Sequence, residues 1–382
     1  MDFMKKTLLI LIALLSARLA PAQDGPDNAK LLEYYQAQRY TEAASYLEKI
    51  YKPDTQNPDE LSKLAYANLM AGKLPEAEHN YLKLYQLDSG NLGTLFSLAG
   101  ISTRRGNSEK ARNYYLEILK LDTSSFNAYK QLSVLNRNDL DLNRIHYLQK
   151  ANDLNNTDAD VAFDLAELYF KMNFFDRANA VLAPALAADT ANLRLLKMKI
   201  PVSIALKKYE EAIQTGENLL AYGDTSAFVL NNLGKAYYLT LDYQNALKSF
   251  LMIKEKVQDN EALYFNIARS YRGLKDYANS VTYLQKAINE GVSPHVASYY
   301  GLLGDSFEQI SKNEEANKAY KKGLDFENDG SLLYNIALVY ETKLNDKKNA
   351  ISYYEQYLKT VDKGKQPKLV KFINNKLEEL KR

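Results

Sequence analysis

Residues Ala227 to Gln258 read AFVLNNLGKAYYLTLDYQNALKSFLMIKEKVQ, the clearest copy of a pattern that recurs along the chain. The first half of this stretch carries small and apolar residues at helical spacing, namely Leu230, Leu233, Gly234 and Tyr237. The second half repeats that spacing with Tyr243, Ala246, Phe250 and Ile253. Leu241 and Asp242 lie between the halves, where we expect a tight turn. The stretch therefore predicts a helical hairpin.

Small and large side chains alternate across this hairpin. Gly234 and Ala246 are small where bulky residues would keep the two helices apart. Tyr237 and Phe250 are large and fill the space beside them. We expect the small residue of each second helix to mark the point where the two helices of a hairpin cross.

The pattern resembles the tetratricopeptide repeat, a 34-residue unit whose signature runs Leu-Gly, Tyr, Ala and Phe. The small residue of the second helix recurs as Ala43, Ala77, Ala111, Arg144, Ala178, Ala212, Ala246, Ser280, Ala316 and Ala350. The intervals between these positions are 34, 34, 33, 34, 34, 34, 34, 36 and 34 residues. The resemblance implies an all-α, right-handed superhelical solenoid of about ten helix-turn-helix repeats.

We expect this solenoid to span residues 29–362 and a C-terminal capping helix to follow over 363–382. The capping helix presents one apolar face, formed by Leu369, Val370, Ile373, Leu377 and Leu380. Without it, the last repeat would expose apolar surface to water.

The middle of the array, about 126–222, departs from the regular pattern. Pro184 and Pro201 fall inside expected helices, where proline removes a backbone hydrogen bond. Arg144 stands where a small residue belongs. We expect its hairpin to open or rotate so that the guanidinium reaches solvent. Ordinary drift of the repeat and a functional hinge are both compatible with this irregularity.

The N-terminus has the form of a secretory signal. Residues 1–22 combine Lys5 and Lys6, an apolar run from Leu8 to Leu15, and the small-residue site Ala20-Pro21-Ala22. An uncleaved anchor is the alternative interpretation. We read residues 23–28 as a flexible lead-in and expect no transmembrane segment in the mature chain. The sequence therefore predicts an exported protein, with the periplasm as its location.

Composition limits the classes of function. The 382 residues are 46% hydrophobic and 25% charged and include no cysteine, which excludes disulfides and thiol chemistry. Removing residues 1–22 lowers Lys plus Arg from 49 to 46 and Asp plus Glu from 47 to 46, so the formal net charge is zero. Because nucleic-acid binders carry an excess of basic residues, we expect no nucleic-acid partner.

Catalytic motifs are absent from the sequence. It contains no P-loop, no paired-histidine helix motif, no nucleophile elbow and no calcium loop. The three histidines, His79, His146 and His295, lie in three different repeats and cannot share one metal ion. We therefore predict a protein that is not an enzyme and that has no metal site and no cofactor.

In tetratricopeptide repeats the first helices line a concave groove that holds segments of partner proteins, and the resemblance implies the same here. The groove positions of the seventh and eighth repeats are Phe228, Asn231, Asn232, Lys235, Tyr238, Leu239, Ala262, Phe265, Asn266, Arg269, Arg272 and Gly273. Asp305, Glu308, Asn335 and Glu341 continue the groove into the ninth and tenth repeats, so it turns from basic to acidic.

The partner-binding residues that we expect are Asn231, Asn232, Lys235, Phe265, Asn266, Arg269 and Arg272. Amides such as Asn232 and Asn266 pair well with a partner's backbone, and cations such as Lys235 and Arg269 can hold a carboxylate. Phe265 would receive an apolar anchor. A purely structural interpretation remains open, because Asn is common in this repeat and Phe can pack against the next helix.

Some co-chaperones of this family grip a C-terminal carboxylate through a clamp spread over three repeats. Only Asn266 fits that clamp, because Asn231, Lys235, Ser298 and Leu302 occupy the other positions. We therefore predict no carboxylate clamp. The leading hypothesis is a non-catalytic scaffold or adaptor in the bacterial cell envelope that binds a protein or peptide in the groove. The groove aromatics suggest an envelope glycan or small-ligand binder as the alternative.

Overall fold

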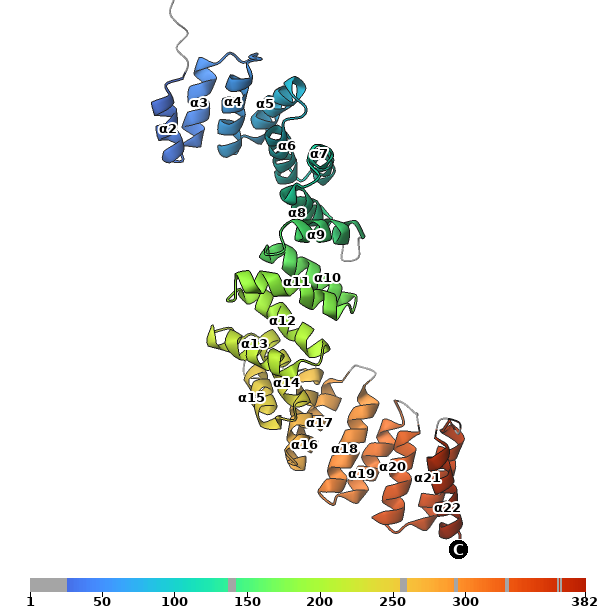
Figure 1. Cartoon of the computed structure of the whole chain (residues 1–382). Helices are drawn as coiled ribbons and strands as arrows, with labels where there is room; N and C mark the ends of the chain where they lie inside the picture. Colours follow the sequence, from blue (N-terminus) through green and yellow to red (C-terminus); the bar gives the residue numbers. More distant parts are fainter. Residues whose placement is uncertain are drawn as a thin grey trace, which may run out of the picture. The chain divides into compact units, whose positions relative to one another are not determined.

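The computed structural model of the chain describes residues 26–136, 142–254, 260–291, 295–326, 330–362, 364 and 366–382. Every regular element in these ranges is a helix (Figure 1). The expected signal peptide at residues 1–22 lies outside the described residues, as does the lead-in up to residue 25. The rest of the lead-in enters the first helix, where the Asp27 carboxylate accepts hydrogen bonds from the amides of Ala29 and Lys30 at 2.9 and 3.3 Å.

The chain divides into two compact units, residues 1–161 and 162–382, which we call unit 1 and unit 2. Unit 1 contains α2 (Asn28–Gln36), α3 (Tyr40–Ile50), α4 (Pro58–Met70), α5 (Leu74–Leu87), α6 (Leu92–Arg104), α7 (Ser108–Leu121), α8 (Phe126–Leu135) and α9 (Leu142–Leu154). Helix α10 (Ala159–Lys171) begins in unit 1 and lies mostly in unit 2.

Unit 2 continues with α11 (Phe175–Ala188), α12 (Leu193–Ala205), α13 (Tyr209–Ala221), α14 (Ala227–Leu239), α15 (Tyr243–Lys254), α16 (Glu261–Gly273), α17 (Tyr277–Glu290), α18 (Val296–Gln309), α19 (Asn313–Gly323), α20 (Ser331–Thr342), α21 (Lys347–Thr360) and α22 (Pro367–Leu380). Taken in chain order, the 21 described helices form ten hairpins and one last helix. The all-α class and the helix-turn-helix array are therefore confirmed.

The small residues of the second helices lie where the repeat predicts. Nine of these residues are fully buried, namely Ala43, Ala77, Ala111, Ala178, Ala212, Ala246, Ser280, Ala316 and Ala350. The two helices of a hairpin also approach closely at the small residues of the first helices. A Cβ added to Gly304 would lie 2.4 Å from Cε1 of Tyr320 on the second helix. At Gly234 the corresponding distance to Cε1 of Phe250 is 2.8 Å. Large rings of the second helices thus lie directly on small residues of the first.

Each described turn inside a hairpin uses one residue with a positive φ, five positions before the small residue. These residues are Gln38, Gly72, Gly106, Asn173, Lys207, Leu241, Lys275, Ser311 and Asn345, with φ between 51° and 78°. The left-handed conformation ends the first helix and lets the chain reverse tightly. At Leu241 the predicted tight turn is confirmed, with φ at 66°.

The expectation for Arg144 is wrong. Its side chain is only 6% exposed, so the guanidinium does not reach open solvent, and α9 packs against α8 as other second helices pack against their partners. The long aliphatic stem of arginine can fill a helix interface, which the small-residue rule does not anticipate. Helices α11 and α12 continue through Pro184 and Pro201, so neither proline ends its helix.

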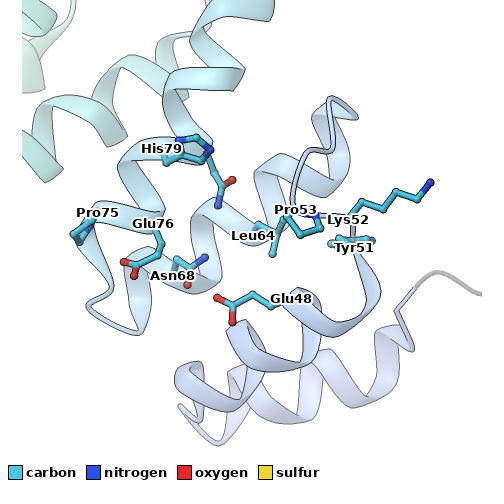
Figure 2. Close-up of a pocket in the computed structure, with 10 residues that line it drawn as sticks. Glu48, Tyr51, Lys52, Pro53, Leu64, Asn68, Pro75, Glu76 and His79 are labelled. Carbon is cyan, nitrogen blue, oxygen red and sulfur yellow. The ribbon is translucent and has the colours of Figure 1, made fainter.

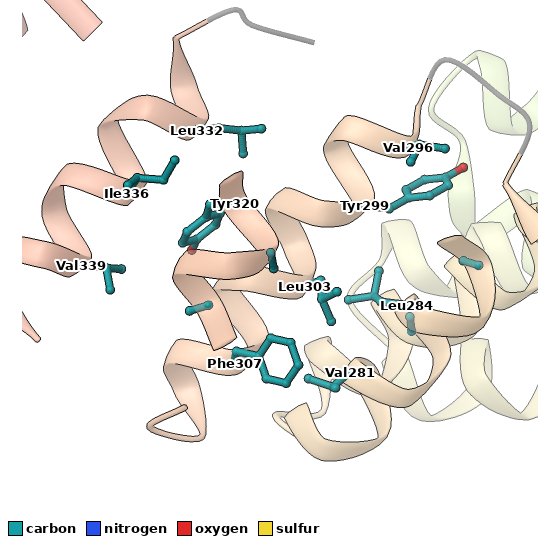
Figure 3. Packing of buried hydrophobic residues seen from close by; sticks show 14 of the residues in the cluster. Val281, Leu284, Val296, Tyr299, Leu303, Phe307, Tyr320, Leu332, Ile336 and Val339 are labelled. Carbon is teal, nitrogen blue, oxygen red and sulfur yellow. The ribbon is translucent and has the colours of Figure 1, made fainter. Parts of the chain in front are cut away.

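The core of unit 2 is continuous from one hairpin to the next. Figure 3 shows Val281 and Leu284 of α17 facing side chains of α18, with Tyr320 of α19 and Ile336 of α20 extending the same cluster. At the end of the array, α22 packs on α21 and buries a last group of side chains, Tyr354, Tyr357, Ile373 and Leu377. No helix among the described residues is long and apolar enough to span a bilayer.

Candidate functional site

The candidate site is one face of unit 2, built from the first helices of four consecutive hairpins, α14, α16, α18 and α20. We call it the groove face and define it by Lys235, Tyr238, Phe265, Arg269, Arg272, Ser298, Tyr299, Leu302, Asp305 and Asn335. Tyr299 belongs to the buried core of unit 2, and Tyr238, Phe265 and Leu302 pack against the core from this side. The polar and charged side chains of the groove face lie outside the apolar stripes.

Rings and one cation connect the first three helices of the groove face. The Cζ atom of Arg269 lies 4.2 Å from the ring centroid of Tyr238 on α14 and 5.4 Å from that of Phe265. The ring of Phe265 lies 4.4 Å from that of Tyr299 on α18, centroid to centroid. A guanidinium over an aromatic ring is held by the ring's electron-rich face. Arg269 is therefore fixed in position while its outer N–H groups stay available.

An ion pair continues the groove face toward α18. Nε of Arg272 donates to Oδ2 of Asp305 at 2.8 Å, and the two side chains are partly exposed. Each screens the other's charge, because the guanidinium and the carboxylate are held together. The free positive charge of the groove face therefore comes from Lys235 and Arg269, and no ion pair of Lys235 occurs within the described ranges.

A pocket of about 340 Å³ opens beside this ion pair. It is lined by α16, α18 and α20, through Arg272, Ala297, Ser298, Gly301, Leu302, Asp305, Ser331, Leu332 and Asn335. Gly301 faces Leu332 across the pocket lining, since a Cβ added to Gly301 would lie 3.3 Å from Cδ2 of Leu332. Three consecutive first helices thus share one cavity that offers a cation, a carboxylate, an amide and two hydroxyls around an apolar floor.

The pKa values of two carboxylates at the acidic end of the groove, Glu308 and Glu341, are shifted in opposite directions. Burial raises the pKa of Glu308, and the nearby Asp305 carboxylate raises it further, although the Tyr320 hydroxyl donates to Glu308 Oε1 at 2.6 Å. Burial also acts on Glu341, but Lys376 and Tyr354 donate to it, each at 2.7 Å, and its pKa is lowered. Glu341 is therefore neutralised by α22, whereas Glu308 is not.

The structure brings together only some of the predicted partner-binding residues. Phe265, Arg269 and Arg272 belong to the connected groove face. Asn232 is buried, and its Nδ2 donates to the carbonyl of Phe228 in its own helix at 2.9 Å. Asn231 and Asn266 are partly exposed. Asn232 is thus engaged in its own helix, and the other positions remain a prediction.

Sequence reasoning missed Tyr299. It precedes Tyr300, which matches the aromatic position that begins the repeat signature, and only the structure shows that Tyr299 faces Phe265. Sequence reasoning also set aside Ser298 and Leu302 because they do not fit a carboxylate clamp, yet both line the 340 Å³ pocket. Gly301 was the available signal, as a glycine on the groove side of a helix.

The three histidines are dispersed in the described part of the chain. His79, His146 and His295 are exposed, and they lie on separate hairpins. No group of three or more His, Asp or Glu side chains within the described part of the chain could hold a metal ion.

Comparison with known proteins supplies a family match. A family model described as tetratricopeptide repeat matches residues 262–289 and 330–360. No curated protein matches the chain. Similar solved structures include one titled as a functional characterisation of Pseudomonas aeruginosa pilF, at 19% identity over 52% of this chain and 89% of that chain, with a TM-score of 0.42.

Two further solved structures are similar in the same range. A structure titled MamA is 20% identical over 44% of this chain and 95% of that chain, with a TM-score of 0.40. A tetratricopeptide repeat protein from Parabacteroides merdae is 18% identical over 75% of this chain and 99% of that chain, with a TM-score of 0.35.

Proposed function

We propose that this tetratricopeptide-repeat protein is a non-catalytic scaffold or adaptor that binds a segment of a partner protein on the groove face of unit 2. The repeats themselves support a protein-interaction scaffold. The observation that carries the proposal is the 340 Å³ pocket shared by α16, α18 and α20, because a segment lying across several hairpins would contact all three helices.

The charges of the groove face favour an extended segment with an acidic portion. Arg269 is held by Tyr238 and Phe265, and Lys235 is exposed on α14 without a partner in the described ranges. A partner carboxylate would pair with these cations, while its neighbouring residues contact the Arg272 and Asp305 pair. A fixed guanidinium loses little conformational entropy on binding, which favours affinity.

We infer that the protein acts in the bacterial cell envelope and is exported to the periplasm. Support comes from the basic start, short apolar run and small-residue site of residues 1–22. Fractionation of cells that produce the full chain tests this location, because a cytoplasmic protein of unprocessed mass would contradict it.

A double variant tests the groove face. Lys235→Glu with Arg269→Glu reverses both cations, so we expect partners recovered from envelope extract by the wild type to be lost. Lys248→Glu with Lys275→Glu makes the same charge change on exposed positions outside the groove face and serves as the control. Circular dichroism checks that both variants keep the wild-type helix content. Equal recovery of every partner by both variants would remove the groove face from consideration.

The alternative, an envelope glycan or small-ligand binder, depends on free aromatic faces. Arg269 covers part of Tyr238, and Phe265 packs against Tyr299, so two of the groove aromatics are already engaged. Thermal stabilisation by cell-wall fragments would support this alternative, since a ligand that binds only the folded state raises Tm.

A further inference from the structure

Unit 1 contains a second cavity, on the side of its second helices. It has a volume of about 440 Å³ and lies between α3 and α5, with α4 beneath. Its lining consists of Glu48, Tyr51, Lys52, Pro53, Leu64, Asn68, Pro75, Glu76, His79 and Asn80 (Figure 2). This site is independent of the groove face, which belongs to unit 2.

The cavity lies where two polar side chains stand at positions that hold aromatic rings in α20 and α21. Tyr340 and Tyr353 stand three residues after the small residues of α20 and α21, and their rings stack at 5.8 Å with an interplanar angle of 19°. In α4 and α5 the same two positions hold Asn68 and Asn80. Two amides thus replace a stacked pair of rings, and the space of the rings is left open.

A charged residue on the preceding second helix also has the opposite sign in the two units. In unit 2, Nζ of Lys321 lies 4.9 Å from the ring centroid of Tyr340 and 5.5 Å from that of Tyr353. The position of Lys321, five residues after the small residue of the preceding second helix, is Glu48 in unit 1. A lysine over two rings in unit 2 therefore corresponds in unit 1 to a glutamate that lines the same cavity as two amides.

Asn68 is the buried polar group of the cavity. Its side chain is 2% exposed, and its Oδ1 atom accepts no hydrogen bond within the described chain. Figure 2 shows this side chain between those of Glu48 and Glu76. A buried acceptor without a donor is costly, so a ligand N–H group that reaches Oδ1 would stabilise the complex.

The other lining groups leave negative charge in excess at the mouth. Glu48 and Glu76 are both exposed there, and Lys52 extends away from the other labelled residues in Figure 2. Lys73 donates to Glu48 Oε1 at 3.3 Å, a partly exposed pair that water screens, and it leaves the second oxygen of that carboxylate available.

We propose that this cavity binds a guanidinium group, with Asn68 at its floor and the carboxylates of Glu48 and Glu76 at its mouth. A guanidinium is flat and fits a space left by stacked rings, and its five N–H donors match one amide oxygen and two carboxylates. The side of the Tyr51 ring, with Pro53 and Leu64, offers apolar contact to the aliphatic stem.

Titration of the full chain with N-acetylarginine amide tests this site, followed by NMR of the side-chain amides of Asn68 and Asn80. N-acetylcitrulline amide has the same shape without the charge, and we expect it to bind at least about tenfold more weakly. Equal affinity for the two compounds, or no shift of either amide with the arginine compound, would overturn the proposal.

Variants locate the binding. Glu48→Gln should weaken the arginine compound about tenfold, because it removes one charged acceptor. Glu109→Gln removes the same charge from an exposed position of α7 and should leave the affinity unchanged. Asn68→Tyr restores the ring and should abolish binding. If Glu48→Gln binds as the wild type does, the assignment is wrong even where Asn68→Tyr fails to fold.

A second arm identifies the source of the guanidinium. A capped Gly-Arg-Gly peptide that binds at least as tightly as N-acetylarginine amide indicates an arginine side chain of a partner protein. A peptide that is excluded while the small compound binds indicates a free guanidinium metabolite. Both results place a guanidinium in the cavity, whereas binding of the peptide that Glu48→Gln does not weaken contradicts the site.

Discussion

The hydroxyl of Tyr320 on α19 donates a hydrogen bond to Oε1 of Glu308 on α18 at 2.6 Å, and the Tyr320 ring lies on Gly304, one turn before Glu308 in α18. The next hairpin repeats the arrangement, since Tyr354 donates to Glu341 at 2.7 Å. A ring that crosses the small residue of the first helix therefore also orients a carboxylate of the groove. The same tyrosine thus links the packing of the repeat signature to the acidic end of the groove.

The two carboxylates should respond oppositely to neutralisation. Because the pKa of Glu308 is raised above 4.5, its contribution to stability is present below that pH and is lost as pH rises through the raised pKa. Glu308→Gln should therefore be at least as stable as the wild type near pH 7, with a gain that disappears in acid. Urea unfolding followed by circular dichroism measures this, and a large loss at neutral pH would contradict it.

Glu341 serves as the matched case. Its pKa lies below 4.5, so its contribution is present above that pH and is lost as pH falls through the lowered pKa. Glu341→Gln weakens the bonds from Lys376 and Tyr354 and should cost about 1 to 2 kcal/mol near pH 7. The difference from the wild type should close in acid. A loss that is independent of pH would show that the charge of Glu341 does not act.

Glycine substitutions should separate close packing from helix propensity. Gly304→Ala places a methyl group 2.4 Å from Cε1 of Tyr320, and we expect a loss of about 1 to 3 kcal/mol. Gly100→Ala is the control, because a Cβ there meets nothing within 4 Å and should stabilise α6 by about 0.5 to 1 kcal/mol. Two changes of the same sign in urea unfolding would contradict this packing.

The left-handed turn residues offer a stabilising change. Leu241 is 68% exposed and has a φ of 66°, which costs a non-glycine residue roughly 1 kcal/mol. Leu241→Gly should therefore raise the stability by up to about 1 kcal/mol. The reverse change, Gly72→Ala, should lower it by a similar amount because Gly72 has a φ of 78°. Thermal unfolding of both variants checks the pair.

The last helix should stabilise the end of unit 2. Ile373 is fully buried against α21, so Ile373→Ala removes packed side-chain volume and should cost about 2 to 5 kcal/mol. Phe372 is exposed on the neighbouring position of α22, and Phe372→Ala is the control with little expected effect. Hydrogen exchange should show faster exchange of α21 in the Ile373 variant, and unchanged protection would contradict a capping role.

Periodicity predicted the parts of the fold that depend on spacing alone. Ala246 and Phe250 lie where the repeat places them, because an interval of 34 residues fixes which side chains meet between neighbouring helices. Arg144 shows the limit of that reasoning, since spacing gives a position but not how a long side chain fits into it. The buried arginine had to be seen in the structure.

The sites were harder to predict than the fold. Whether Arg269 or Arg272 keeps an available charge depends on ring and carboxylate positions on neighbouring helices, and sequence does not give those distances. At the cavity, Asn68 was readable as a departure from the signature tyrosine, whereas the position of Asn80 varies from repeat to repeat. Its significance follows only when the stacked rings at the same positions of unit 2 are in view.

Site-specific photocrosslinking in the native cell tests the groove face most directly. A photoreactive residue at Lys235 lies on the groove face, and one at Lys248 lies on the exposed side of the second helix of the same hairpin. We predict a discrete crosslinked protein at position 235 that is absent at 248 and that disappears when Arg269→Glu is added. The same crosslinked species at both positions, or none at 235, would contradict partner binding on the groove face.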